Sequence, residues 1–274
     1  VFAHMTTKIN PKIYQGVNII AVVVTIIFNF LANALPLNRV TTEQVSDSYP
    51  NLFTPPGYVF VIWGVIYTLA LLFMVYQARA NQREEAYLRE ISFLYFIGAL
   101  INISWLFLFH YSYGVSTIFG VSVIDLVLLL VVLLLIYGRL GIGTKEVSRN
   151  QKLAVHLPIS VYLGWISLAT IAAIASELNV LIPDIPMATQ ELWTAIMIIV
   201  ALVLTLLMVD RRSDFAFGLV VIWASIGIAE KQSAIPLIFM TAISAAILIA
   251  VALIIMPFLK KTSIVNFYMV RGGQ

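Results

Sequence analysis

An acidic residue, Asp125, lies inside the long apolar run of residues 115–137. A carboxyl group in apolar surroundings can hold or relay a proton, or can accept hydrogen bonds from a ligand. Indole rings can stack against a flat apolar ligand while their N–H groups bind its polar edge. Four tryptophans lie deep within other apolar runs, namely Trp63, Trp105, Trp165 and Trp223.

The common catalytic patterns are not found in this sequence. There is no Ser-His-Asp spacing and no His-Glu-x-x-His, and the glycines at 138, 141 and 143 lack the strand–helix context of a phosphate loop. His110 and His156 have no second histidine or acid three or four residues further on, so no metal site is predicted. The sequence therefore predicts a protein that is not an enzyme.

Composition places the chain among membrane proteins. Of its 274 residues, 61% are hydrophobic and only 11% are charged, which is not typical of a soluble domain. The basic residues fall in short loops, so they indicate membrane topology and no nucleic-acid partner. The absence of cysteine excludes disulfides and thiolate metal sites.

The hydrophobic pattern predicts an all-α, polytopic bundle of about eight transmembrane helices. Most segments are long enough to cross the hydrocarbon core, which takes about 20 residues, and 215–229 is the short one. Residues 1–5 are set aside as an added sequence, and 17–35 is expected to stay as a helix because no cleavable signal peptide is evident. The segments are 17–35, 57–77, 91–111, 115–137, 154–176, 192–209, 215–229 and 234–257.

The loops predict which side each end of the bundle faces. With the N-terminus inside, every Lys and Arg except Arg39 and Lys231 falls on the cytoplasmic side. This bias predicts eight crossings of a bacterial or archaeal cell membrane, with both termini in the cytoplasm. Loops 36–56 and 177–191 are the long ones outside, and we expect them to cover the outer mouth of the bundle.

Asp125 is expected near the middle of the membrane. It lies ten residues into its segment, which at 1.5 Å per residue is about 15 Å deep. It is expected to face the interior, with Asn102 and Tyr67 as hydrogen-bond partners, and to line a cavity or proton path. The alternative is that Asp125 is a neutral acid that only hydrogen-bonds between helices. Asn29 and Asn33 are interpreted as polar packing contacts between helices.

The stretch Thr54–Tyr67 marks the start of the second helix. Two prolines followed by an apolar run are typical of a helix N-terminus. Phe60, Trp63 and Tyr67 are three and four residues apart and share one face. Taken alone they are typical of ordinary core packing. Similar aromatic and polar faces recur on later helices, and this recurrence supports the alternative of an aromatic pocket.

Segments two to five resemble the TspO/MBR family, the tryptophan-rich sensory proteins that include the mitochondrial translocator protein. The resemblance rests on four motifs in order over about residues 50–176. They are Pro55-Pro56-Gly57-Tyr58-Val59-Phe60 with Trp63 and Tyr67, then Leu100, Asn102, Trp105 and Phe109, then Val123–Leu128 around Asp125, and Tyr162-Leu163-Gly164-Trp165-Ile166-Ser167-Leu168-Ala169-Thr170.

The chain also departs from the family pattern. The interval from Phe60 to Trp63 is one residue shorter than usual and lacks the family's Gly-Pro, Pro158 is displaced, and Ile171-Ala172-Ala173 replaces a Leu-Asn. The family core has five helices, so the resemblance divides this chain into an N-terminal helix and outer loop (1–49), a TspO-like core (50–191) and added C-terminal helices (192–274).

The resemblance implies a lipid-embedded protein that binds a hydrophobic, often planar ligand, with a sensory or transport role. Porphyrin, haem or a sterol-like molecule is the ligand class it implies, and no other cofactor is expected. Family members are often dimers, although the added helices can cover that surface here. The ligand-binding residues it implies are Phe60, Trp63, Tyr67, Asn102, Trp105, Asp125, Tyr162, Trp165 and Thr170.

Two other classes of function stay open from the sequence. In a proton-coupled secondary transporter, Asp125 would be the coupling carboxylate, although the two halves of the chain show none of the internal repeats common in such proteins. In a structural subunit, the core would contain no cavity. Uptake into proteoliposomes that depends on pH would distinguish the transporter from a protein that only binds a ligand.

Overall fold

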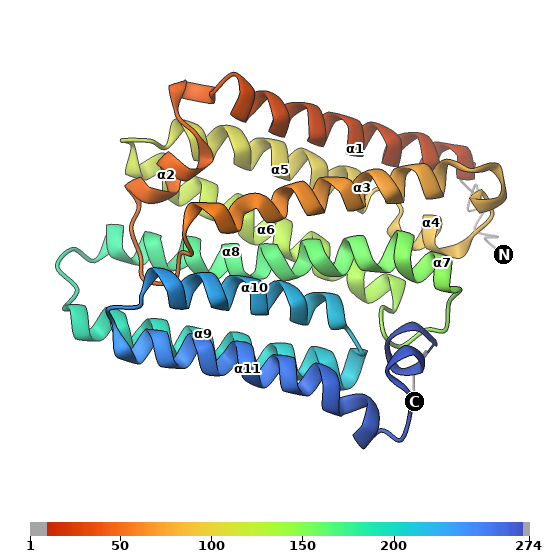
Figure 1. Ribbon diagram of the computed structural model, residues 1–274. Helices are drawn as coiled ribbons and strands as arrows, with labels where there is room; N and C mark the ends of the chain where they lie inside the picture. Colours follow the sequence, from red (N-terminus) through yellow and green to blue (C-terminus); the bar gives the residue numbers. More distant parts are fainter. Residues whose placement is uncertain (1–9, 271–274) are drawn as a thin grey trace, which may run out of the picture.

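The computed structural model of the protein describes residues 10–270, and its long elements are all α-helices. Eight long helices run alternately in opposite directions, so that each lies antiparallel to the next along the chain (Figure 1). The predicted all-α bundle is thereby confirmed. The helices are α1 (Pro11–Ala34), α3 (Ile62–Ala78), α5 (Leu94–Tyr111), α6 (Ser116–Leu140), α8 (Leu157–Leu181), α9 (Met187–Arg212), α10 (Phe215–Lys231) and α11 (Pro236–Leu259).

Short elements lie at the two ends of the bundle. We call the end that carries α2 (Thr42–Ser48) the α2 end; α4 (Ala86–Ile91), α7 (Arg149–Gln151) and both ends of the described chain lie at the opposite end (Figure 1). Three 3₁₀ turns, Leu37–Arg39, Gly57–Val61 and Ala80–Gln82, and two π-helical turns, Lys152–His156 and Asn266–Val270, complete the set.

Local sequence explains where the helices begin. Proline occupies the first turn of α1, α8 and α11, where its missing N–H has no partner to lose. Thr41 and Gln44 form a capping box that starts α2. Pro56 precedes a 3₁₀ turn, and the α-helix itself begins only at Ile62, because the N–H of Val59 bonds to the Pro56 carbonyl in the tighter pattern.

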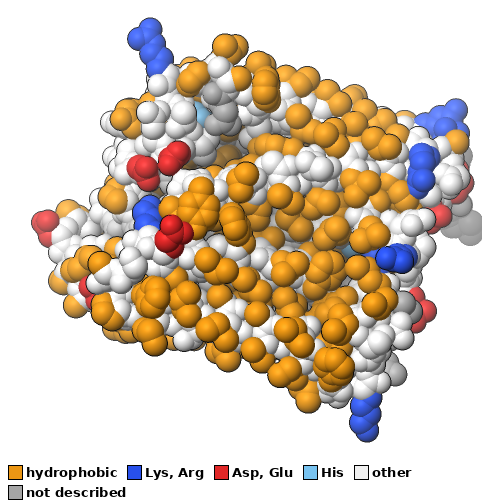
Figure 2. Space-filling model, in the orientation of Figure 1, with side chains coloured by type: hydrophobic (Ala, Val, Ile, Leu, Met, Phe, Trp, Pro, Cys, Tyr) orange, Lys and Arg blue, Asp and Glu red, His pale blue; other side chains and the backbone are white. Residues whose placement is uncertain are grey.

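Within residues 10–270, seven helices are long and apolar enough to cross a membrane. The exception, α10, has 17 residues and is the segment that the sequence predicted to be short, yet it too runs from one end of the bundle to the other (Figure 1). Figure 2 shows hydrophobic side chains over the middle of the visible face and charged side chains towards its ends. This distribution fits a bundle whose middle lies in lipid.

Charge is distributed unequally between the two ends. Among the described residues, every Lys and Arg except Arg39 and Lys231 lies at the end opposite α2, which we call the basic end. The sequence predicted this grouping, although Lys8 and Arg271 lie outside the described residues. Which side of a membrane the basic end faces stays a prediction.

The helices share a single core. One continuous cluster of buried hydrophobic side chains extends from Tyr14 on α1 to Ile249 on α11. α6 and α8 lie side by side in its centre, with α1, α3 and α5 on one side and α9, α10 and α11 on the other (Figure 1). Gly164 on α8 lets α10 approach closely, since a Cβ there would lie 3.2 Å from Val220. The predicted division of the chain at residues 49 and 191 stays a prediction.

Candidate ligand-binding site

An apolar cavity lies inside the bundle near the α2 end. It contains about 750 Å³ of space free of protein atoms, part of it open to the outside. Its walls come from α2, α3, α5, α6, α8 and α10 and from the loop before α3. They include Thr42, Ser46, Tyr49, Phe53, Phe60, Trp63, Trp105, Phe109, Phe119, Ser122, Leu126, Trp165, Ala169, Ala172, Ala173, Ser176, Ala224 and Ile228.

Aromatic rings from separate helices meet at the cavity wall around Trp63. The Trp63 ring centroid lies 6.2 Å from that of Trp105 in a stacked arrangement and 6.3 Å from that of Trp165 at a steep angle. Phe60 packs edge-on against Trp165 at 5.7 Å. Such pairs fix one another's orientation, so the wall is rigid as well as apolar.

The indole N–H of Trp165 is buried and has no hydrogen-bond partner among the described residues. The side chain is only 3% exposed, so water outside the protein does not reach this group freely. Trp223, by contrast, donates its N–H to the Val59 carbonyl at 3.1 Å. A buried donor left unpaired costs free energy, so an acceptor atom within reach of this N–H would stabilise the protein.

Alanines on one face of α8 make the room for the cavity. Ala169, Ala172 and Ala173 are spaced three and four residues apart, so they lie on the same side of the helix. Larger side chains at these positions would fill the space between α8 and the aromatic wall. The cavity is therefore a consequence of residue size at three neighbouring positions.

A second, polar cavity adjoins the first and extends it towards the α2 end. It contains about 1110 Å³ of space, much of it open, and we call it the vestibule. Ser46, Tyr49, Thr54 and Ser176 line both cavities. The apolar cavity and the vestibule thus share a wall, and together they offer an apolar compartment next to a polar one.

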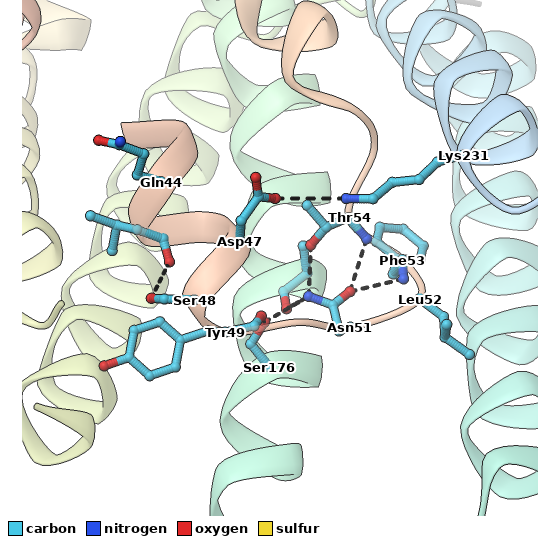
Figure 3. Close-up of polar contacts among 12 residues, drawn as sticks. Gln44, Asp47, Ser48, Tyr49, Asn51, Leu52, Phe53, Thr54, Ser176 and Lys231 are labelled. Carbon is cyan, nitrogen blue, oxygen red and sulfur yellow. Dashed lines mark hydrogen bonds and ion pairs between the residues drawn. The ribbon is translucent and has the colours of Figure 1, made fainter. Parts of the chain in front are cut away.

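Asn51 holds the loop that forms this shared wall (Figure 3). Its Oδ1 accepts the backbone N–H groups of Phe53 and Thr54, both at 2.8 Å. Its Nδ2 donates to the Ser176 hydroxyl at 2.6 Å and so ties the loop to α8. Because the amide is buried and its bonds reach two elements, the loop has a defined position above the cavity.

An ion pair lies across the vestibule. The carboxylate of Asp47 on α2 and the ammonium of Lys231 at the end of α10 are 3.9 Å apart (Figure 3). Both side chains are partly exposed, so the pair contributes little to stability. It does place one positive and one negative group within reach of any molecule in the vestibule.

Tyr49 lies where the two cavities meet. Its ring stacks on Phe119 with centroids 3.9 Å apart, and its hydroxyl donates to the Ser112 carbonyl. Its own carbonyl accepts the Ser176 hydroxyl at 2.6 Å. The side chain therefore links the loop to α6, to the α5–α6 turn and to α8.

Four of the nine site residues predicted from the sequence line the apolar cavity. They are Phe60, Trp63, Trp105 and Trp165. Tyr67 stacks on Trp63 at 5.8 Å but, with Tyr162, lines a separate, smaller cavity among α1, α3, α5, α6 and α8. Thr170 is buried and donates its hydroxyl to the Ile166 carbonyl at 2.7 Å, which occupies that group within its own helix.

Asn102 and Asp125 do not form the pair that the sequence predicted. Asn102 faces α1, where its Oδ1 accepts the Asn29 amide at 2.8 Å. Asp125 is half-buried, and its Oδ2 is buried without a hydrogen-bond partner among the described residues. It does not line the apolar cavity, although Ser122 and Leu126 of the same helix do. The predicted partnership is wrong, because Asn102 bonds instead to Asn29 on α1.

The vestibule and its loop residues were not identified from the sequence. Loops 36–56 and 177–191 were expected to cover the mouth of the bundle, and both contribute to the vestibule, the first through Asp47 and Asn51 and the second through Asn179 and Asp184. The individual side chains carried no periodic signal. Within residues 10–270 no group of three His, Asp or Glu side chains is arranged to hold a metal ion.

The match to a family model covers most of the chain. The model of the TSPO-like protein family matches residues 15–255, from α1 into α11, and so extends well beyond residues 50–176, where the motifs indicated the resemblance. Neither the curated proteins nor the solved structures give a match. The extent of the family match and the apolar helices give one conclusion: this chain belongs to the TSPO-like protein family and is an integral membrane protein that crosses the bilayer several times.

Proposed function

We propose that the protein binds a hydrophobic ligand that carries a hydrogen-bond acceptor in the apolar cavity beneath α2. The observation that carries this proposal is the unpaired N–H of Trp165, which has no partner among the described residues, in the wall of an otherwise apolar space. A ligand acceptor atom would satisfy that donor, and the apolar body of the ligand would replace empty space. The family resemblance implies that such binding serves a sensory or transport role.

A planar molecule such as a porphyrin, haem or a sterol-like compound suits this wall. The rings of Trp63 and Trp105 are tilted by only 25° to each other and offer a flat apolar face. The vestibule would take the polar edge of the ligand, and Lys231 could pair with a carboxylate there. A sterol would fill the same space and leave Lys231 unused.

Titration with a porphyrin panel tests the proposal. Purified protein is titrated with protoporphyrin IX, its dimethyl ester and a sterol, with binding followed by tryptophan quenching and by ligand absorbance. Trp165→Phe keeps an aromatic ring but removes the donor, so affinity should fall about three- to tenfold. Trp193→Phe is the matched control, because Trp193 lies on α9, outside the apolar cavity, and is 38% exposed.

The comparison between ligands adds a second criterion. Free-acid porphyrin should bind more tightly than its dimethyl ester, and Lys231→Gln should remove that difference. Two results would contradict the proposal. One is a loss of affinity in Trp193→Phe as large as that in Trp165→Phe, and the other is no saturable binding of any compound.

A proton-coupled transporter is the second candidate function. The observation in its favour is Asp125, a half-buried carboxyl group with one oxygen that has no hydrogen-bond partner among the described residues. An acid in this setting can gain and lose a proton during transport. Uptake of porphyrin into proteoliposomes under a pH gradient tests this candidate. Uptake that needs the gradient and is lost in Asp125→Asn supports it. Uptake that depends neither on the gradient nor on Asp125 rejects it.

We further propose that the basic end faces the cytoplasm of a bacterial or archaeal cell. The support is the excess of Lys and Arg at that end. The chain has no cysteine, so single cysteines are unambiguous probes. In intact cells an impermeant thiol reagent should label Asp184→Cys and spare Glu146→Cys, and the reverse pattern would contradict this orientation.

A further inference from the structure

A third cavity lies at the basic end, on the opposite side of the molecule from the vestibule. It contains about 440 Å³ of space, partly open. Its walls come from the loop after α6, the π-helical turn before α8, the α9–α10 turn and the C-terminal turn. The polar side chains that line it are Lys152, His156, Ser160, Arg212, Ser213, Asp214 and Tyr268.

The Asp214 carboxylate in this wall already accepts hydrogen bonds from neighbouring groups. Asp214 is 5% exposed, caps α10 through the N–H of Phe217 at 3.0 Å, and accepts the Tyr137 hydroxyl at 2.9 Å. Ser160 is a further hydrogen-bond partner. Because these neutral donors engage its lone pairs, the carboxylate has little capacity left to compete with an anion for the positive side chains of the same wall.

His156 supplies a donor or acceptor that is still free. Its side chain is 5% exposed, and its Nε2 is buried with no hydrogen-bond partner in the part of the chain that the structure describes. It closes the π-helical turn Lys152–His156, in which the N–H of Leu157 bonds to the Lys152 carbonyl. Wide turns of this kind are common at functional sites. Here the turn brings a cationic side chain and an imidazole to one cavity.

Arg212 is held against the same cavity by the loop after α6. Its Nη1 donates to the Ile142 carbonyl at 3.4 Å, and its guanidinium lies 5.9 Å from the centre of the Tyr137 ring. Gly143 packs so closely on the Arg212 backbone that a Cβ would lie 1.9 Å from the Arg212 carbonyl oxygen. These contacts fix where the end of α9 lies.

We propose that this cavity binds a phosphate group, with Lys152 and Arg212 as charged donors and His156 Nε2 as a neutral one. A phosphate offers several acceptor oxygens and pairs well with guanidinium and ammonium groups. It can come from the head group of an anionic lipid or from a soluble phosphate compound. The site is separate from the apolar cavity, so the proposal stands or falls independently of ligand binding there.

Binding assays on the full chain separate the two sources. In neutral detergent, calorimetric titration with inorganic phosphate against a chloride blank tests the soluble source. Native mass spectrometry with phosphatidylglycerol beside phosphatidylcholine tests the lipid source. Saturable binding of phosphate, or selective retention of phosphatidylglycerol, is the expected result in at least one arm.

Neighbouring arginines provide a matched control. Arg212→Gln, Lys152→Gln and His156→Leu should each weaken binding about tenfold or more. Arg211→Gln removes the same charge from the adjacent position, but Arg211 is exposed and pairs with Asp210 at 3.3 Å, so binding should stay within about twofold. Three separate variants keep the test decisive if one of them fails to fold.

Two results would overturn the proposal. One is no saturable binding in either arm. The other is an equal loss in Arg211→Gln and Arg212→Gln, which would mean that the general positive charge of this end attracts anions without a defined site.

Discussion

The Asn29 side-chain amide donates a hydrogen bond of 2.8 Å to Oδ1 of Asn102, which joins α1 to α5 in the middle of the bundle. Asn102 is fully buried and Asn29 is 4% exposed. Asn29 also donates to the Thr25 carbonyl of its own helix at 2.9 Å. The pair connects the first helix to a helix that bears the aromatic wall.

Loss of either asparagine should destabilise the bundle modestly. Asn29→Ala and Asn102→Ala should each lower the free energy of unfolding by about 0.5–1.5 kcal/mol, the range for polar pairs between membrane helices. In a double-mutant cycle measured by unfolding in mixed detergent, the double variant should lose less than the sum of the single losses. Strict additivity would show that the two side chains are not coupled.

Filling the apolar cavity should abolish ligand binding without unfolding the protein. Ala169→Leu places a larger side chain in the space beside Trp165, so porphyrin affinity should fall more than tenfold, because the ligand and the new side chain cannot occupy the same volume. Ser244→Leu on the exposed face of α11 adds similar bulk outside the cavity and should bind as the wild type does. Equal affinity in both variants would exclude this cavity as the binding site.

Two glycines with nearly the same positive φ should differ in their tolerance of alanine. Gly114 has φ of +76° and no atom within 4 Å of the point that a Cβ would occupy, so Gly114→Ala should cost about 1–2 kcal/mol, the penalty of left-handed backbone alone. Gly143 has φ of +77°, and its Cβ would meet the Arg212 carbonyl oxygen at 1.9 Å. Gly143→Ala should therefore lower Tm distinctly further than Gly114→Ala in a thermal scan.

The stability of the protein should depend on pH through Asp214. Burial raises the pKa of the Asp214 carboxyl above its usual range, although hydrogen bonds from Phe217, Ser160 and Tyr137 act in the opposite direction. The folded state therefore holds the proton more tightly than the unfolded state. This contribution to stability is complete below the ordinary carboxyl range and is lost as pH rises through the raised pKa.

Asp214→Asn provides the measurement for that dependence. Asparagine also caps helices well, so α10 should keep its start. The difference in free energy of unfolding between wild type and variant should shift against the wild type as pH rises from about 4 to 7. A constant difference across this range would contradict the raised pKa.

The fold followed from the sequence because hydropathy and loop charge are properties of whole segments. The apolar runs that ended near Tyr111 and Tyr137 correspond to α5 and α6. The number and order of the apolar segments also predicted that Lys and Arg gather at one end of the bundle. α10 was also identified as the short segment. None of these predictions required knowledge of which way a side chain points.

The site was predictable only in part because it depends on helix rotation and loop conformation. The spacing of Phe60 and Trp63 placed both on one face, and both line the cavity. Asn102 was expected to pair with Asp125, but it bonds to Asn29 on α1, and hydropathy alone does not determine how each helix is rotated about its axis. Tyr49 owes its place to the bonds of Asn51, which no periodic pattern encodes.

The place of Tyr49 between the two cavities couples them mechanically. Its ring stacks on Phe119, its hydroxyl donates to the Ser112 carbonyl, and its own carbonyl accepts the Ser176 hydroxyl. Because the same side chain lines both spaces, a shift of the loop that reshapes the vestibule also moves part of the wall of the apolar cavity.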